Sequence, residues 1–197
     1  MTDIPFAILR HAPTDWNALG RLQGLTDTNL SRDGEEVVRR WRLPSPADGW
    51  KRVSSPLQRA RRTAELLQPA MPVGIDSALR EMSFGVWEGR TLPELRAEGG
   101  ESFAAAEAAG LDFQPPGGES PRTTMVRLAG WASTLREPVV AVSHKAAIRA
   151  LLALATGWDM LGRPPHKLDW RSLHFFVVSG DGKVAIDRLN VPFEKAA

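Results

Sequence analysis

Residues 138–155, PVVAVSHKAAIRALLALA, decide the fold class of this chain. The run 138–143 is short and apolar, and it is the clearest strand pattern in the sequence. The run 146–155 is almost entirely apolar and predicts a buried helix. His144 lies between the two. The segment therefore predicts a strand that leads into a helix, with a histidine at the carboxyl end of the strand.

Two earlier segments repeat this order. Residues 4–9 form a short apolar run, bounded by Pro5 and Pro13, and Arg10 and His11 follow at its end. Residues 52–55 predict a second short strand, and Pro56 stands where prolines commonly open a helix. The helix after Pro56 has one apolar face, formed by Leu57, Ala60, Ala64 and Leu67. Strands that alternate with helices predict an α/β fold with a mostly parallel central sheet.

The remaining segments predict supporting elements of one domain, 1–197. Residues 31–43 predict an amphipathic helix, and residues 120–135 predict another that opens with Ser120 as its N-cap. Residues 175–178 and 184–186 predict a closing hairpin. Residues 85–120 are rich in small and turn-forming residues. We expect them to form at most short helices, as a cap-like excursion over the active face.

The composition excludes several classes of function. The chain has 197 residues and no cysteine, which excludes disulfides, thiolate metal sites and a cysteine nucleophile. Its net charge of +2 gives little indication of nucleic acid binding, which usually takes a basic stripe or patch. The sequence shows no bilayer-spanning apolar run and no secretory leader, so we expect a cytoplasmic protein without a membrane partner. Arginine outnumbers lysine by 20 to 5, and the planar guanidinium is suited to oxyanions.

His11 and His144 are candidate catalytic residues because both follow predicted strands at one edge of the sheet. A single histidine at a strand end is commonly structural, but here Arg10 stands beside His11, and Arg59 falls at the same edge. A phosphate dianion needs several fixed cations and helix N-terminal amides around its oxygens, and this edge could supply both. A histidine nucleophile in such a site must be the neutral imidazole.

Other chemistries fit the sequence less well. Ser54, Ser55 and Ser143 fall near the same edge, but none lies in a G-x-S-x-G turn and no aspartate completes a recognisable triad. A metal site would need more ligands than two histidines, and the sequence has neither H-E-x-x-H nor a carboxylate cluster at ligand spacing. It also lacks a Walker loop and a G-x-G-x-x-G after a strand. We therefore expect a reaction carried by side chains alone, with no metal and no cofactor.

Five blocks extend this pattern along most of the chain. They are 9–17 (LRHAPTDWN), 21–34 (RLQGLTDTNLSRDG), 54–64 (SSPLQRARRTA), 79–89 (LREMSFGVWEG) and 142–152 (VSHKAAIRALL). In motif and order they resemble the histidine phosphatase superfamily (branch 1), also called the phosphoglycerate mutase-like superfamily. The resemblance implies a three-layer α/β/α sandwich.

The resemblance also implies a role for each matching residue. His11 attacks phosphorus in line, while Arg10, Arg59 and His144 hold the phosphoryl oxygens. Glu81 protonates the leaving oxygen and then activates the water that hydrolyses the phosphohistidine, so that one group serves as acid and then as base. The matching positions Asn17, Gln23 and Gly24 are also expected to bind substrate, and Lys145, which does not match the family pattern, is a further candidate.

Two positions depart from the family pattern. Ala12 stands where the signature normally has glycine, which adds a methyl group where the backbone passes close to phosphate. Lys145 also replaces a usual glycine. Its side chain either helps to bind an anionic substrate or points to solvent.

The segment after Glu81 favours a phosphatase over a mutase. Residues 84–92, FGVWEGRTL, resemble the phosphatase branch, including the alpha-ribazole phosphatase type, and the chain has no tyrosine. Residues 115–120 resemble a junction from which Glu119 is expected to reach the pocket. We therefore expect a metal-independent phosphomonoesterase that acts through a phosphohistidine on a small phosphorylated metabolite. Phosphoglycerate mutase-type phosphoryl transfer and a noncatalytic phosphate-binding regulatory module are the alternatives. The substrate and the oligomeric state stay open.

Overall fold

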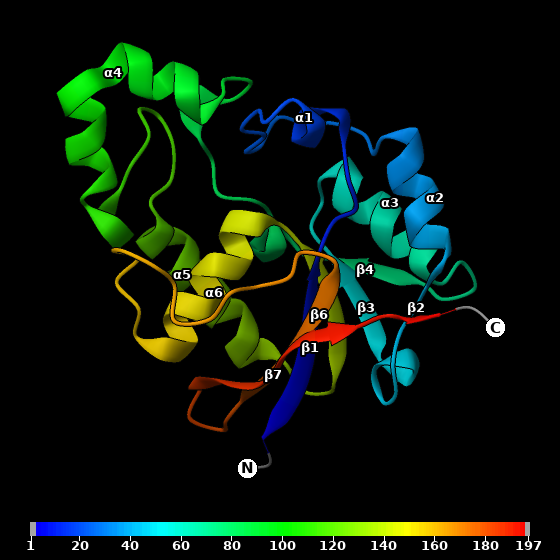
Figure 1. Ribbon diagram of the computed structural model, residues 1–197. Helices are drawn as coiled ribbons and strands as arrows, with labels where there is room; N and C mark the ends of the chain where they lie inside the picture. The colour runs from blue at the N-terminus through cyan, green and yellow to red at the C-terminus, as the bar shows by residue number, and fades with distance from the viewer. Residues whose placement is uncertain (1–2, 196–197) are drawn as a thin grey trace.

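The computed structural model describes residues 3–195, and helices cover both sides of its central sheet (Figure 1). The strands of this sheet lie in the order β4-β3-β5-β1-β6-β7. Their bounds are β1 (Ile4–Arg10), β3 (Lys51–Ser54), β4 (Val73–Ile75), β5 (Val139–Ser143), β6 (Ser172–Val178) and β7 (Val184–Pro192). The first four in this order run parallel to one another, whereas β6 is antiparallel to both of its neighbours. The predicted α/β class with a mostly parallel sheet is confirmed.

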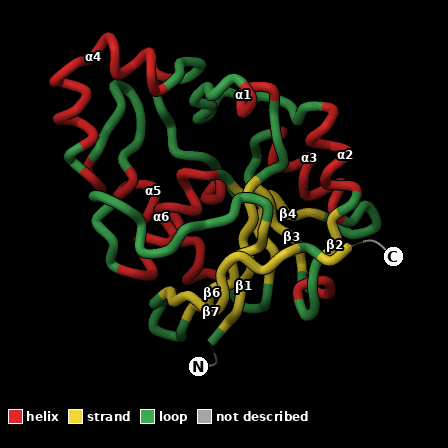
Figure 2. Tube along the Cα trace, in the orientation of Figure 1, coloured by secondary structure: helices red, strands yellow, loops and turns green. Residues whose placement is uncertain are grey.

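Strand β1 shows why the molecule has three layers. Phe6 and Ile8 point into a core covered by α5 (Pro121–Thr134) and α6 (Lys145–Thr156). Ala7 and Leu9 point the other way, into a core covered by α2 (Arg32–Arg39) and α3 (Gln58–Leu67). Successive side chains of a strand alternate between its two faces, so a strand that is apolar throughout requires cover on both. Figure 2 shows the two groups of helices on either side of the strands.

The segment 138–155 occupies the middle of this arrangement. All five residues of β5 are buried, and the strand lies between β1 and β3. Helix α6 follows without a loop and ends at Gly157, whose φ of 73° provides the left-handed C-cap. The predicted strand and helix are therefore confirmed.

Some predicted boundaries are wrong. The helix expected over 31–43 ends at Arg39, because Trp41 begins the short strand β2 (Trp41–Arg42), which pairs with β8 (Glu194–Lys195). The Trp41 ring stacks on Phe193, with centroids 4.2 Å apart. In the helix expected over 120–135, Val126 is 66% exposed and not part of the apolar face.

Residues 85–120 lie largely beyond the carboxyl end of β1, where α4 (Leu92–Glu107) and α1 (Asp15–Ala18) are found (Figure 1). Gly100, with φ 48° and ψ −128°, divides α4 into two short helical segments, as expected for this region. Trp87 packs on Phe103 and Phe113, with ring centroids 5.0 and 5.5 Å away. Short 3-10 turns cover Ala47–Gly49, Ser77–Leu79, Gly85–Trp87 and Gly110–Asp112. Within residues 3–195, no helix is long and apolar enough to cross a membrane.

Candidate active site

The ends of three adjacent parallel strands bring the predicted residues together. The backbone N–H of His11 donates to the Ser143 carbonyl at 2.9 Å, and that of Ser55 donates to the Val142 carbonyl at 3.0 Å. These bonds continue the ladder past the last residues of β1 and β3. The imidazole centroids of His11 and His144 are 5.2 Å apart, and both residues are buried. The juxtaposition expected at this sheet edge is therefore present.

The environment of His11 favours the neutral form of its imidazole. Its Nδ1 lies 2.7 Å from the Ala12 carbonyl oxygen, which can only accept, so we assign the proton to Nδ1. The lone pair of Nε2 is then free for attack. Burial, followed by the charges of Arg10 and Arg59, holds the pKa of His11 well below its ordinary value, against the opposing effect of the Ala12 carbonyl. The neutral imidazole is therefore the favoured form at neutral pH.

Arg59, on α3, is completely buried and held by the backbone. Its Nη1 and Nη2 donate to the carbonyl oxygens of Thr26 and Gly24 at 2.9 and 2.8 Å. One helical turn later, the Thr63 hydroxyl donates to the Arg59 carbonyl at 2.7 Å and accepts from Ala12 N–H at 3.0 Å. Thr63 thus links the backbone next to His11 to the helix that carries Arg59.

His144 completes a group of polar atoms around His11. Its Nε2 lies 2.7 Å from the Ser55 hydroxyl. Burial first, and then the neighbouring His11 and the charges of Arg59 and Arg10, hold the pKa of His144 well below its ordinary value. Within residues 3–195, its Nδ1 and the Nε atoms of Arg10 and Arg59 are buried without a hydrogen-bond partner. Buried polar atoms normally have partners, and an oxyanion supplies acceptors for such arginine N–H groups.

Glu81 lies at the first turn of α6, beside His144. Glu81 is 7% exposed, and its carboxyl group accepts from the backbone N–H groups of Met82 and Ala147, both at 3.0 Å, and of Ala146 at 3.2 Å. These three bonds fix the position of the Glu81 carboxyl group at the start of α6. Burial lowers the pKa of both site arginines, and the negative charge of Glu81 partly offsets that effect. Glu81 therefore belongs electrostatically to the same site.

Two predicted substrate-binding residues have structural partners. The Asn17 side-chain oxygen accepts from Thr14 N–H at 3.0 Å in a capping box at the start of α1. The Gln23 side-chain oxygen accepts from the Thr28 hydroxyl at 2.6 Å. Their contact with substrate stays a prediction, whereas their role in ordering these loops is visible.

The other two predicted substrate-binding residues differ in setting. Gly24 offers its carbonyl to Arg59, and its φ of 53°, with Glu88 packed against its Cα, leaves no room for a side chain. Lys145 is exposed, and its Nζ lies 5.7 Å from the centroid of the Trp170 ring. The residue as a whole is exposed, but its ammonium group is partly desolvated, and this desolvation, followed by the charge of Arg10, lowers the pKa of Lys145. Lys145 therefore lies close enough to Arg10 for the charge of that arginine to act on its ammonium group.

Glu88 is a site-ordering residue that sequence reasoning did not identify. Its carboxylate accepts from Leu25 N at 2.9 Å, Thr26 N at 2.8 Å, Thr26 Oγ1 at 2.6 Å and Phe84 N at 3.1 Å. It thereby fixes the loop whose carbonyls hold Arg59. Thr63 was also missed, although its place four residues after Arg59 on a predicted helix puts both on one face.

Glu119 was expected to reach the pocket but pairs with two arginines. Its carboxylate accepts from Arg80 at 2.6 Å and from Arg127 at 3.2 Å. Arg127 was not identified from the sequence. Within residues 3–195, no group of three or more histidine and acidic side chains could hold a metal ion.

Residues 6–192 match the histidine phosphatase superfamily (branch 1), and the chain belongs to it. It is 35% identical over 178 residues to the glucosyl-3-phosphoglycerate phosphatase of Mycolicibacterium vanbaalenii, covering 79% of this chain and 77% of that protein. It is 31% identical over 160 residues to the 2,3-bisphosphoglycerate-dependent phosphoglycerate mutase of Azorhizobium caulinodans, covering 74% and 78%. A solved mycobacterial glucosyl-3-phosphoglycerate phosphatase, in complex with VO3, superposes with a TM-score of 0.74 at 28% identity over 95% of this chain and 99% of that one. The predicted superfamily, its fold and the phosphatase enzyme class are confirmed.

Proposed function

We propose that this chain hydrolyses monoesters of small phosphorylated metabolites through a phosphohistidine at His11, without a metal ion. The observation that carries the proposal is the state of His11. It is neutral and buried, its Nδ1 is occupied by the Ala12 carbonyl, and two arginines lie beside it. A nucleophilic imidazole needs a free lone pair, and charge that develops on phosphoryl oxygens needs fixed cations.

In the first step, Nε2 of His11 attacks phosphorus as the bond to the leaving oxygen breaks. Arg10, Arg59 and His144 hold the nonbridging oxygens during the transfer. Glu81, in its protonated form, gives its proton to the leaving oxygen, so that the alcohol departs uncharged. The products of this step are the alcohol, a phosphohistidine and a Glu81 carboxylate.

In the second step, water attacks the phosphohistidine. The Glu81 carboxylate accepts a proton from the water as its oxygen bonds to phosphorus, and the bond between phosphorus and Nε2 breaks. Inorganic phosphate leaves, His11 is again neutral, and Glu81 is again protonated. The cycle consumes one ester and one water, and it needs no further reactant.

The relatives support a small-molecule substrate. Two of them are named for compounds built on phosphoglycerate. The mutase among them keeps phosphoryl transfer between two positions of one metabolite as a second candidate, which a product assay with 3-phosphoglycerate and 2,3-bisphosphoglycerate would reveal. The cytoplasmic location expected from the sequence is part of this proposal and is open to cell fractionation.

The decisive experiment compares wild type with His11→Ala on p-nitrophenyl phosphate, in chelator, from mildly acidic to neutral pH. Acid-labile labelling of the protein is the companion measurement. His166→Ala, which removes an exposed loop histidine, is the matched control. We expect turnover and label in wild type and in the control, and neither in His11→Ala. Wild type that binds vanadate without turnover would instead indicate the noncatalytic module.

A further inference from the structure

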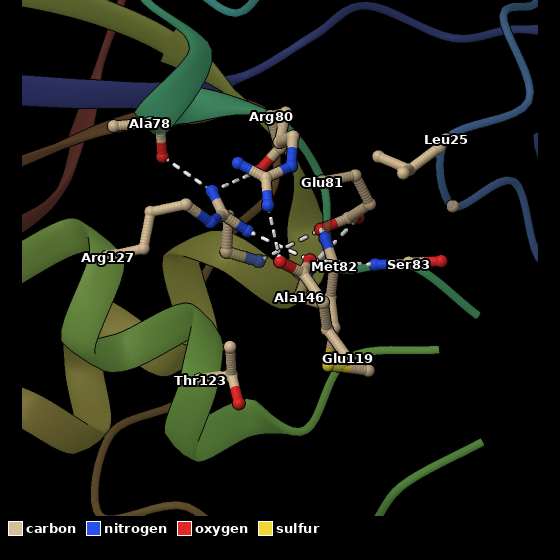
Figure 3. Close-up of polar contacts among 12 residues, drawn as sticks. Leu25, Ala78, Arg80, Glu81, Met82, Ser83, Glu119, Thr123, Arg127 and Ala146 are labelled. Atoms are coloured by element: carbon tan, nitrogen blue, oxygen red, sulfur yellow. Dashed lines mark hydrogen bonds and ion pairs between the residues drawn. The ribbon is translucent and has the colours of Figure 1, made fainter. Parts of the chain in front are cut away.

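Glu119, Arg80 and Arg127 form a hydrogen-bonded cluster next to Glu81 (Figure 3). One oxygen of Glu119 accepts from Arg80 at 2.6 Å. The other accepts from Ser83 N–H at 3.1 Å and from Arg127 at 3.2 Å. Glu119 thus contacts a residue immediately before Glu81 and another two positions after it.

Arg127 holds the same segment from helix α5. Its Nη1 donates to the Ala78 carbonyl at 2.5 Å and to the Arg80 carbonyl at 3.0 Å, while its Nη2 pairs with Glu119. The Arg127 side chain is 12% exposed and that of Glu119 is 15% exposed. A guanidinium has donors in a fixed planar fork, so one side chain can bind two carbonyls and a carboxylate at once.

Segment 78–83 is therefore held from two sides. Arg127 on α5 and Glu119, two residues before that helix, bind its backbone, whereas the Glu81 carboxyl group binds amides in the first turn of α6. Two further bonds reinforce the segment. Ser143 donates to the Leu79 carbonyl at 2.8 Å, and Glu119 N–H donates to the Ser83 carbonyl at 2.9 Å.

We propose that Glu119 and Arg127 are positioning residues, which hold segment 78–83 so that Glu81 meets the leaving oxygen and then the water. The proposal rests on the proposed function, because it assigns an effect on the acid–base steps of that reaction. Neither residue touches the reacting atoms. A purely structural role predicts lower stability and the same fall in kcat/KM on every substrate. A positioning role predicts a larger fall in kcat/KM for esters whose leaving oxygen is more basic and depends more on receiving a proton.

The test uses Glu119→Gln and Arg127→Gln, with Arg127→Lys as the milder variant if either fails to fold. Arg122→Gln is the matched control, since it lies on the same helix and pairs with Asp112 at 2.7 Å between exposed side chains. We would measure kcat/KM, which reports the first transfer step, for p-nitrophenyl phosphate and for an alkyl phosphate. Thermal denaturation of each variant checks its folding.

We expect both variants to lose about tenfold or more on the alkyl ester, a fraction of the roughly 100- to 10,000-fold contribution of general acid–base catalysis. The loss on p-nitrophenyl phosphate should stay below about threefold, because this leaving group departs without a proton. The control should behave as wild type on both substrates. Equal losses on both esters, or no loss on either, would overturn the proposal.

A double-mutant cycle with Glu81→Gln gives the second readout, on phenyl phosphate. If Glu119 acts through Glu81, then Glu119→Gln should change kcat/KM by less than about twofold once Glu81 is already glutamine. An unchanged loss in that background refutes the positioning role. Failure of the proposed function looks different, because wild type would then lack turnover or His11→Ala would keep it.

Discussion

Replacing Glu88 with glutamine tests whether the loop that holds Arg59 depends on one carboxylate. Each Glu88 oxygen accepts two hydrogen bonds, and three of the four donors belong to residues 25 and 26. Glutamine keeps one acceptor oxygen and places an NH2 group where the other stood. The Thr26 hydroxyl can reverse and accept from this NH2, but the Thr26 backbone N–H then faces a donor.

The magnitude follows from these bonds. A hydrogen bond to a charged group contributes about 1.5–3 kcal/mol, and the site is partly exposed, so loss of one bond and of the charge should cost about 2 kcal/mol. For a chain of this length, each kcal/mol lowers Tm by about 2–4 °C, which gives a drop of about 4–8 °C. Because the same loop offers two carbonyls to Arg59, kcat/KM should also fall by about fivefold or more, equivalent to about 1 kcal/mol.

The assay combines thermal denaturation with turnover of p-nitrophenyl phosphate. Glu107→Gln is the control, because Glu107 is exposed and, within residues 3–195, its one ion-pair partner is Arg96 on the same helix, α4. Its Tm and kcat/KM should match those of wild type. A Glu88→Gln protein with wild-type Tm and wild-type kcat/KM would refute the reasoning, because the four bonds would then contribute nothing to the loop.

Two further predictions concern buried residues. Burial lowers the pKa of His174 from 6.5 to about 4, so between these values the unfolded chain binds more protons than the folded one, and stability falls as pH drops from 6.5 toward 4, by up to about 3 kcal/mol. Urea unfolding at several pH values should show a flatter acid limb for His174→Gln than for wild type, and equal slopes would disprove this contribution. Thr63→Val should lower stability by about 2 kcal/mol because Ala12 N–H loses its acceptor, and it should also reduce kcat/KM. Thr63→Ser keeps the hydroxyl and should restore most of both quantities, which a purely steric role for Thr63 would not predict.

The elements that could be predicted from the sequence are those that a short, continuous pattern of residues defines. Strand β5 and helix α6 follow from uninterrupted apolar runs, and His144 at their junction follows from the order of the two. Strand β2 was not predicted, because the spacing of Trp41 fits a helical pattern. In the structure Trp41 instead stacks on Phe193, which lies 152 positions later in the chain. Distant contacts override local periodicity, and a single sequence does not display them.

The same distinction applies to the site. Arg10, His11 and His144 were predictable because parallel strands bring their carboxyl ends to one edge. Arg127 was not, because two of its partners are backbone carbonyls at 78 and 80, which carry no sequence signal, and the third is the carboxylate of Glu119, which no local pattern links to it. The capping role of Asn17 could have been predicted from the sequence, because Thr14 stands three residues before it, the spacing of a capping box.

The position of β5 has a consequence for the order of synthesis. This strand lies between β1 and β3, although it follows both in the chain. A nascent chain shorter than about residue 143 therefore exposes facing edges of β1 and β3, the kind of unpaired edge that recruits other chains. The same fragment lacks His144. The ribosome must therefore synthesise about 143 residues before the sheet or the phosphate site can close. We expect this N-terminal fragment to depend on chaperones until β5 is available.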